Sequence, residues 1–177
     1  FSYTFSKQYG TFTSIKAYGV EHLADKIKLT SYRAPTDNDK NTHHFWANVN
    51  IWQGENIDCQ FSKVYDCRIE DGKIVCDCSV AGVSRVPYFK YTQEITISKN
   101  GRIDFAICGD IRKDTIFLPR LGFEIEMPDS INEFSYYANG PLESYCDLCH
   151  ASSVGLYESN TDKEYVNYVR PQEHGNH

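Results

Sequence analysis

Hydrophobic and polar residues alternate along most of this chain, and a period of two residues is typical of strands that are buried on one face. The pattern predicts half-buried strands over residues 11–18 and 26–32. Residues 43–52 depart from it, because their apolar positions recur at helical spacing. We therefore expect one short helix in a chain that otherwise forms strands.

Two hairpins are predicted in the middle of the chain, with their turns at Asp71-Gly72 and Asn100-Gly101. Asp-Gly and Asn-Gly tolerate positive φ angles and match the twist of tight hairpins. The strands that these turns join are residues 61–70, 73–83, 88–99 and 102–110.

A third pair of strands is expected at residues 120–126 and 132–138, separated by the turn-like sequence 127–130. Residues 154–158 add one more candidate strand, and roughly the last thirty residues read as loops. The fold class predicted is all-β and antiparallel, with residues 1–177 forming a single domain that is itself a fragment.

Composition narrows the classes of function. The net charge is -6 and no basic run occurs, which argues against nucleic acid as a partner. No run of eighteen apolar residues occurs, which argues against a membrane span. Seven cysteines are an odd number for a disulfide framework, so we expect a reducing compartment, the cytoplasm. Aromatic residues make up 14%, which fits Tyr-rich strands or stacking on a sugar. A chain that starts at Phe1 is expected to be part of a longer protein.

Three loop-like segments concentrate charged and amide side chains beside proline or glycine. They are residues 33–39 (Arg-Ala-Pro-Thr-Asp-Asn-Asp), 140–145 (Gly-Pro-Leu-Glu-Ser-Tyr) and 171–177 (Pro-Gln-Glu-His-Gly-Asn-His). Rigid loops that present polar groups are common sites of binding and catalysis.

These segments, together with Pro119-Arg120-Leu121-Gly122, lie in the order and spacing of one family. The chain resembles the C-terminal domain, or small chain, of the β-galactosidases of glycoside hydrolase family two. The resemblance covers nearly the whole chain. One departure is Leu148, where the family commonly has an arginine after Asp147.

The resemblance implies an antiparallel β-supersandwich similar to galactose mutarotase, incomplete at its C-terminus. It implies a parent enzyme that hydrolyses terminal β-D-galactosides such as lactose with retention, through two glutamates on an upstream barrel. It implies no catalytic residue and no cofactor here, with Mg and Na bound by other domains. The implied partners are the barrel domain, a galactoside substrate and further copies of the enzyme.

Arg33, Asp37, Asn38 and Asp39 allow two interpretations. They form a structural clasp, in which Asp and Asn accept backbone N–H groups after Pro35. Alternatively they face a sugar or dock this domain on the barrel. Asp37 and Asp39 are too close in sequence to act as a pair of glycosidase carboxylates.

Glu143, Tyr145 and Asp147 lie at alternate positions, so they are expected on one side of their loop. They form either a polar rim or a sugar-facing or interdomain surface, and Glu173 and His174 join the same set of candidates. If these residues face a sugar, the first alternative function is an autonomous carbohydrate-binding or mutarotase-like module.

Cys146, Cys149 and His150 spell a haem-attachment motif, but a strand-rich chain in a reducing compartment argues against haem. Zinc is the better alternative, with His174 or His177 as a further ligand. A zinc-stabilised interaction domain is therefore the second alternative function. The other interpretation is that these cysteines are free thiols that bind no metal.

Residues 109–118 link two predicted strands and carry Arg112, Lys113 and Asp114 at their centre. The resemblance makes this segment a mobile loop near an active-site mouth. The alternative is an ordinary surface loop.

Overall fold

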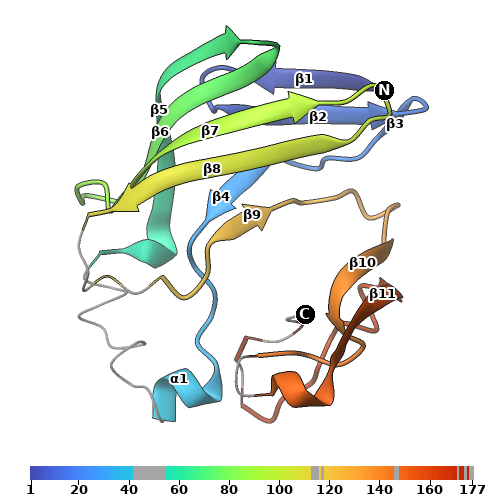
Figure 1. Ribbon diagram of the computed structural model, residues 1–177. Coiled ribbons are helices and arrows are strands. Elements are labelled where there is room, and N and C mark those ends of the chain that lie inside the picture. Colours follow the sequence, from blue (N-terminus) through green and yellow to red (C-terminus); the bar gives the residue numbers. More distant parts are fainter. Residues whose placement is uncertain are drawn as a thin grey trace.

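The computed structural model describes residues 1–41, 55–112, 116, 118–145, 148–170, 172–173 and 175. The fold is all-β and antiparallel, as the alternating pattern predicts. Two large sheets occupy the upper half of the molecule in Figure 1, and two short strand pairs lie below them.

The first large sheet has the order β1-β2-β3 and the second the order β5-β6-β7-β8. Their bounds are β1 Ser2–Ser6, β2 Thr11–Ala17, β3 Val20–Glu21, β5 Gln60–Glu70, β6 Lys73–Gly82, β7 Phe89–Ile97 and β8 Ile103–Ile111. Strand β1 lies outside the strands that the alternating pattern predicts.

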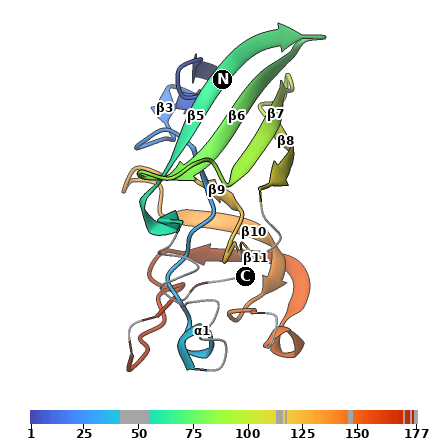
Figure 2. The ribbon, with the colours of Figure 1, turned by 90° about the vertical axis from the view of Figure 1, so that its left-hand side faces the viewer.

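The two sheets pack face to face through aromatic and aliphatic side chains. Phe12 of β2 is 0% exposed and contacts Phe105 of β8 edge-on, with ring centroids 6.2 Å apart. Ile95 of β7, 1% exposed, lies in the same cluster. Burial of such side chains drives the sheets together, so the upper half is a sandwich (Figures 1 and 2).

Both predicted hairpins are confirmed. Asp71 and Gly72 have φ angles of 50° and 77°, as a two-residue hairpin turn requires. The second turn is wider than predicted, because β7 ends at Ile97 and β8 begins at Ile103. There Gly101 alone has a positive φ, 89°, and its N–H donates to the carbonyl of Ser98.

The predicted pairing of residues 120–126 with 132–138 is wrong. Strand β9 (Gly122–Glu124) pairs with β4 (Lys28–Thr30), and β10 (Glu133–Gly140) pairs with β11 (Ser153–Asn160). Phe123 of β9 packs on Phe105, with ring centroids 4.6 Å apart. That contact draws β9 to the core of the sandwich and away from β10.

The remaining elements are short: α1 Asp37–Asn41, η1 Ile57–Cys59 and η2 Cys149–Ala151. Strand β11 confirms the strand expected at 154–158, and the described part after residue 160 holds no strand. The helix expected at 43–52 lies outside the described residues. Within the described ranges, no helix is long and apolar enough to span a bilayer.

Candidate functional site

The segment 33–39 folds into a tight turn that begins α1. The N–H of Asp39 donates to Thr36 Oγ1 at 3.2 Å, and Asp39 Oδ2 accepts the N–H of Thr36 at 2.7 Å. This reciprocal pair is a capping box, which satisfies two backbone donors at a helix start. The Thr-x-x-Asp spacing therefore fixes the backbone locally.

Arg33 completes this turn with a forked ion pair to Asp39. Its Nη1 lies 2.5 Å from Oδ2 and its Nη2 lies 3.3 Å from Oδ1. Both groups are withdrawn from water, with side-chain exposures of 12% for Arg33 and 4% for Asp39. Arg33 also donates to the carbonyls of Ala34 and Pro119, at 3.0 and 3.2 Å.

The charge of Asp39 is stabilised by these donors. Burial by itself would raise the pKa of the Asp39 carboxyl, but hydrogen bonds from Arg33 and Thr36 outweigh it and leave that pKa below its ordinary value. Asp39 is thus an anion in the folded protein and is held in place as one.

The segment near the C-terminus closes over this turn. Glu173 Oε2 accepts the N–H of Ala34 at 3.1 Å, and its Oε1 accepts a hydrogen bond from Arg120 Nη2. Gln172 Oε1 accepts the N–H of Asp37 at 2.5 Å. The loops at 33–39, 119–120 and 172–173 therefore meet at one place.

The loop at 140–145 joins the same region and begins with a cis Gly140–Pro141 peptide. Glu143 Oε2 accepts the hydroxyl of Tyr168 at 2.6 Å, and its Oε1 accepts the N–H of Gly175 at 2.7 Å. The hydrogen bond to Glu143 raises the pKa of Tyr168. We call Arg33, Asp39, Arg120, Glu143 and Glu173 the loop clasp.

Tyr145 lies among these charges. Its hydroxyl is buried and has no hydrogen-bond partner among the described residues. Burial raises its pKa to about 12, with smaller contributions from the charges of Glu143 and Glu173 and an opposing one from Arg33. Glu143, Glu173 and Arg33 thus all act on Tyr145, which places this side chain beside the clasp.

The clasp engages its carboxylates with the chain's own donors. Asp39 accepts from Arg33 and Thr36, Glu173 from Arg120 and Ala34, and Glu143 from Tyr168 and Gly175. A glycosidase pair needs one carboxylate poised as an acid and another open to the sugar. The geometry of these three groups suits fastening of loops, as the structural interpretation of Arg33 and Asp39 predicts.

The other predicted residues are placed as follows. Asp37 and Asn38 are exposed on α1. Arg112, just after β8, pairs with Glu55 at 2.8 Å and donates to the carbonyl of Pro87 at 3.1 Å. Residues that lie outside the described part are Lys113, Asp114, Cys146, Asp147, His174 and His177.

The zinc hypothesis stays a prediction, because Cys146, His174 and His177 belong to the undescribed residues. Cys149 and His150 lie in η2, half-buried and exposed respectively. Among the described residues, no group of three or more potential ligands is close enough to hold a metal ion.

Sequence reasoning missed Tyr168 and the roles of Thr36, Arg120 and Gln172. Thr36 had a readable signal, since Thr-x-x-Asp before a helix is a capping box. Tyr168 had none, because it contacts Glu143 across 25 residues of chain.

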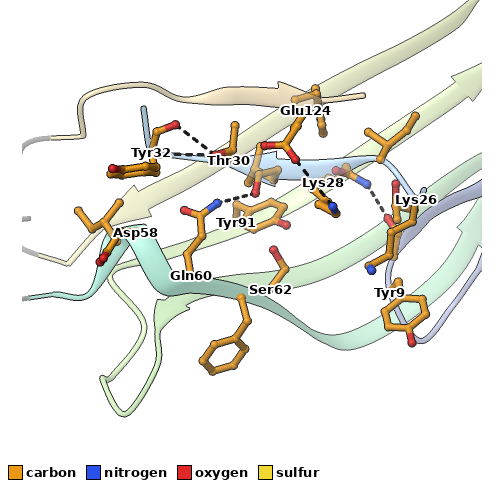
Figure 3. Close-up of a pocket in the computed structure, with 18 residues that line it drawn as sticks. Tyr9, Lys26, Lys28, Thr30, Tyr32, Asp58, Gln60, Ser62, Tyr91 and Glu124 are labelled. Atoms are coloured by element: carbon orange, nitrogen blue, oxygen red, sulfur yellow. Dashed lines mark hydrogen bonds and ion pairs between the residues drawn. The ribbon is translucent and has the colours of Figure 1, made fainter. Parts of the chain in front are cut away.

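A second concave feature lies in the upper half, between β4 and the start of β5 (Figure 3). This groove has a volume of about 470 Å³, within the size range of small-ligand sites. No member of the loop clasp lines it. Its walls carry aromatic rings, hydroxyls and charged groups, among them Tyr9, Tyr32, Phe61, Tyr91, Thr30, Ser62, Lys26, Lys28, Asp58 and Glu124.

Gln60 lines the groove and fastens β5 to β4. Its Nε2 donates to the carbonyl of Leu29 at 3.0 Å, and its Oε1 accepts the N–H of Ser31 at 3.1 Å. A side-chain amide here takes the place of a neighbouring strand. The groove therefore rests on a fixed base, and Tyr91, 7% exposed, packs beneath it.

Comparison with known families identifies the chain. The model of a family described as the β-galactosidase small chain matches residues 1–177. The chain belongs to this family. The motif loops that meet in the clasp are thus loops of a β-galactosidase small chain.

Individual relatives agree. The chain is 32% identical to a β-galactosidase of Streptococcus thermophilus and 27% identical to one of Actinobacillus pleuropneumoniae, in each case over 100% of the chain. A β-galactosidase of Kluyveromyces lactis is 28% identical over 97% of the chain. In all three cases the chain spans only 17% of the relative's length.

Proposed function

We propose that this chain is a non-catalytic domain of a β-galactosidase of glycoside hydrolase family two. It lies in the C-terminal part of an enzyme that hydrolyses terminal β-D-galactosides, such as lactose, with retention. Its role is to support the rim of the active site and the assembly of the enzyme. The loop clasp fastens the loops that carry out this role.

The observation that carries the proposal is the state of the clasp carboxylates. Asp39, Glu143 and Glu173 are each engaged by two or more donors of this chain, so none is free to act as a nucleophile. The named relatives are β-galactosidases about six times longer than this chain. Their remaining length has room for the glutamate pair that retention requires.

The rest of the proposal follows from the same family membership. The catalytic glutamates lie on a barrel domain, which is the main partner of this chain. Mg and Na are bound by other domains of the enzyme. The whole enzyme acts as a homo-oligomer in the cytoplasm, on a galactoside substrate.

Two assays test the role. The purified chain alone, repurified to constant composition, is expected to release no o-nitrophenol from o-nitrophenyl β-D-galactoside. In the intact parent enzyme, Arg33→Ala is expected to lower thermal stability and activity together, because it unfastens the clasp. Arg102→Ala is the matched control, since its side chain is 71% exposed and lies in the turn between β7 and β8, outside the clasp.

Hydrolysis by the chain alone, at a rate that survives repurification, would overturn the proposal. So would an Arg33→Ala enzyme that matches the Arg102→Ala control in both stability and activity.

The groove of Figure 3 favours a second candidate, an autonomous carbohydrate-binding module. Aromatic faces beside hydroxyls and carboxylates suit a sugar, which has an apolar face and a polar rim. Calorimetric titration with galactose is expected to give saturable heat that Asp58→Ala abolishes and Asp129→Ala, on a distant turn, leaves intact. A flat titration of the folded chain would exclude this candidate and leave the first.

A further inference from the structure

Two cysteines face each other across the β5–β6 hairpin. Cys67 of β5 is the direct partner of Cys76 of β6 in the register of the sheet. Their Sγ atoms are 2.9 Å apart, and both thiols are free. The two sulfurs are therefore neighbours because of the backbone ladder and not because of a chance rotamer.

The position of the pair in the ladder is favourable for a bond between the sulfurs. The two-residue turn at Asp71-Gly72 makes Glu70 and Lys73 a hydrogen-bonded pair. Antiparallel pairs alternate, so counting back three steps places Cys67 and Cys76 at a non-hydrogen-bonded pair. At such pairs the Cα atoms are about 4.5 Å apart, inside the range that disulfides span.

The two thiols differ in their access to solvent. Cys76 is 0% exposed and belongs to the main hydrophobic cluster, whereas Cys67 is only half-buried at its edge. Burial, followed by the contact with Cys67, raises the pKa of the Cys76 thiol. An external reagent should therefore meet Cys67 first, and Cys76 should react only through Cys67.

We infer that Cys67 and Cys76 form a reversible thiol–disulfide pair whose reaction partner is a low-molecular-weight disulfide such as oxidised glutathione. The thiolate of Cys67 attacks one sulfur of glutathione disulfide, forms a mixed disulfide and releases one glutathione thiolate. The thiol of Cys76 gives up its proton to solvent and attacks the Cys67 sulfur, which releases the second glutathione. Two protein thiols are oxidised and one small disulfide is reduced to two thiols.

This inference rests on the hairpin and its register and does not depend on the proposed function. Formation of the bond would cross-link β5 to β6 beside Gln93 of β7, which is the ladder partner of Cys76 and lines the groove. Reduction would release the strands again, so the bond is one that the cell's thiol pool controls.

The experiment uses the whole 177-residue chain, reduced, freed of reductant and incubated with oxidised glutathione. Trypsin cuts after Lys63, Arg68, Lys73 and Arg85, so Cys67 falls in peptide 64–68 and Cys76 in peptide 74–85. Mass spectrometry is expected to find these two peptides linked, with a net loss of two hydrogen atoms. Fragmentation of the linked species assigns the bond to Cys76 or to Cys78.

Two variants complete the test. Cys67→Ser is expected to abolish the linked species and to leave Cys76 unmodified, because no glutathione reaches it directly. Cys108→Ser removes an exposed thiol from β8 and is expected to form the linked species as the parent chain does. Circular dichroism before and after oxidation shows whether each sample keeps its strands.

Either of two results would overturn the inference in a folded sample. One is glutathione that stays on Cys67 through prolonged incubation without a link to Cys76. The other is a link from Cys67 to Cys78 or to another cysteine in place of Cys76.

Discussion

Replacement of Asp39 by alanine is the sharpest test of the loop clasp. Asp39 is 3% exposed, accepts two hydrogen bonds from Arg33, and accepts the N–H of Thr36. The substitution leaves a guanidinium that is only 12% exposed without its counter-charge. It also leaves the first turn of α1 without half of its capping box.

The expected loss of stability is large. Removing one partner of a buried ion pair costs about 3–5 kcal/mol. Arg33 keeps the carbonyls of Ala34 and Pro119 as acceptors, so the lower end of this range applies. A lost helix cap adds about 1 kcal/mol. Because these two terms overlap, we expect Asp39→Ala to lower the free energy of unfolding by about 3–4 kcal/mol.

Urea unfolding followed by circular dichroism measures the effect. Asp129→Ala is the control, since it removes an exposed carboxylate outside the loop clasp and should change stability by less than about 0.5 kcal/mol. Asp39→Asn should fall between the two, because its amide oxygen still accepts the N–H of Thr36 but the charge is gone. The pKa of Asp39 is lowered, so its contribution is present at neutral pH and is lost as pH falls through that folded pKa.

Two outcomes would refute this reasoning. The first is an Asp39→Ala chain within about 0.5 kcal/mol of the parent, the size of an ordinary surface substitution. The second is a difference between parent and variant that does not shrink as the pH falls. Either would mean that the ion pair does not fasten the loop.

Three further predictions concern other parts of the molecule. A Cβ at Gly82 would lie 1.9 Å from the carbonyl oxygen of Glu55, whereas one at Gly122 would meet no atom within 4 Å. Gly82→Ala should therefore lower the free energy of unfolding in urea by about 1–3 kcal/mol, and Gly122→Ala should leave it almost unchanged. Tyr145→Phe removes a buried hydroxyl without a described partner, so it should raise the thermal midpoint or leave it unchanged, and a fall would show that the hydroxyl is bonded. The hydrogen bond from Ser14, with smaller contributions from backbone N–H groups, lowers the pKa of Glu21 to about 2, so the stabilising effect of this carboxylate is present at neutral pH and lost as pH falls towards 2. Carbon-detected NMR should show that Ser14→Ala moves this pKa part of the way back towards 4.5.

The features predicted correctly from sequence are those that neighbouring residues determine. Asp71-Gly72 defines its hairpin because both residues take positive φ angles, and the flanking strands then follow by register. The ion pair between Arg33 and Asp39 forms for the same reason, since the two residues are only six positions apart.

The features that sequence reasoning missed depend on contacts between distant residues. Strand β9 has three residues and pairs with β4, which lies more than 90 residues earlier in the chain. Lys28 is the ladder partner of Glu124, and its Nζ also binds Glu126, just after β9. No local pattern specifies such a partner. The engagement of Glu173 by Ala34 is likewise invisible in sequence, because 139 residues separate them.

This last separation has a consequence for how the chain acquires its structure during synthesis. A ribosome adds about 5–20 residues per second, so Glu173 is made roughly 7–28 s after Ala34. Until Pro119 is made, the 33–39 turn has only the contacts within itself, the capping box and the Arg33–Asp39 pair, and Arg33 then gains the carbonyl of Pro119 before Glu173 is made. Because of this order of synthesis, the local ion pair must hold the turn in the shape that Glu173 later binds.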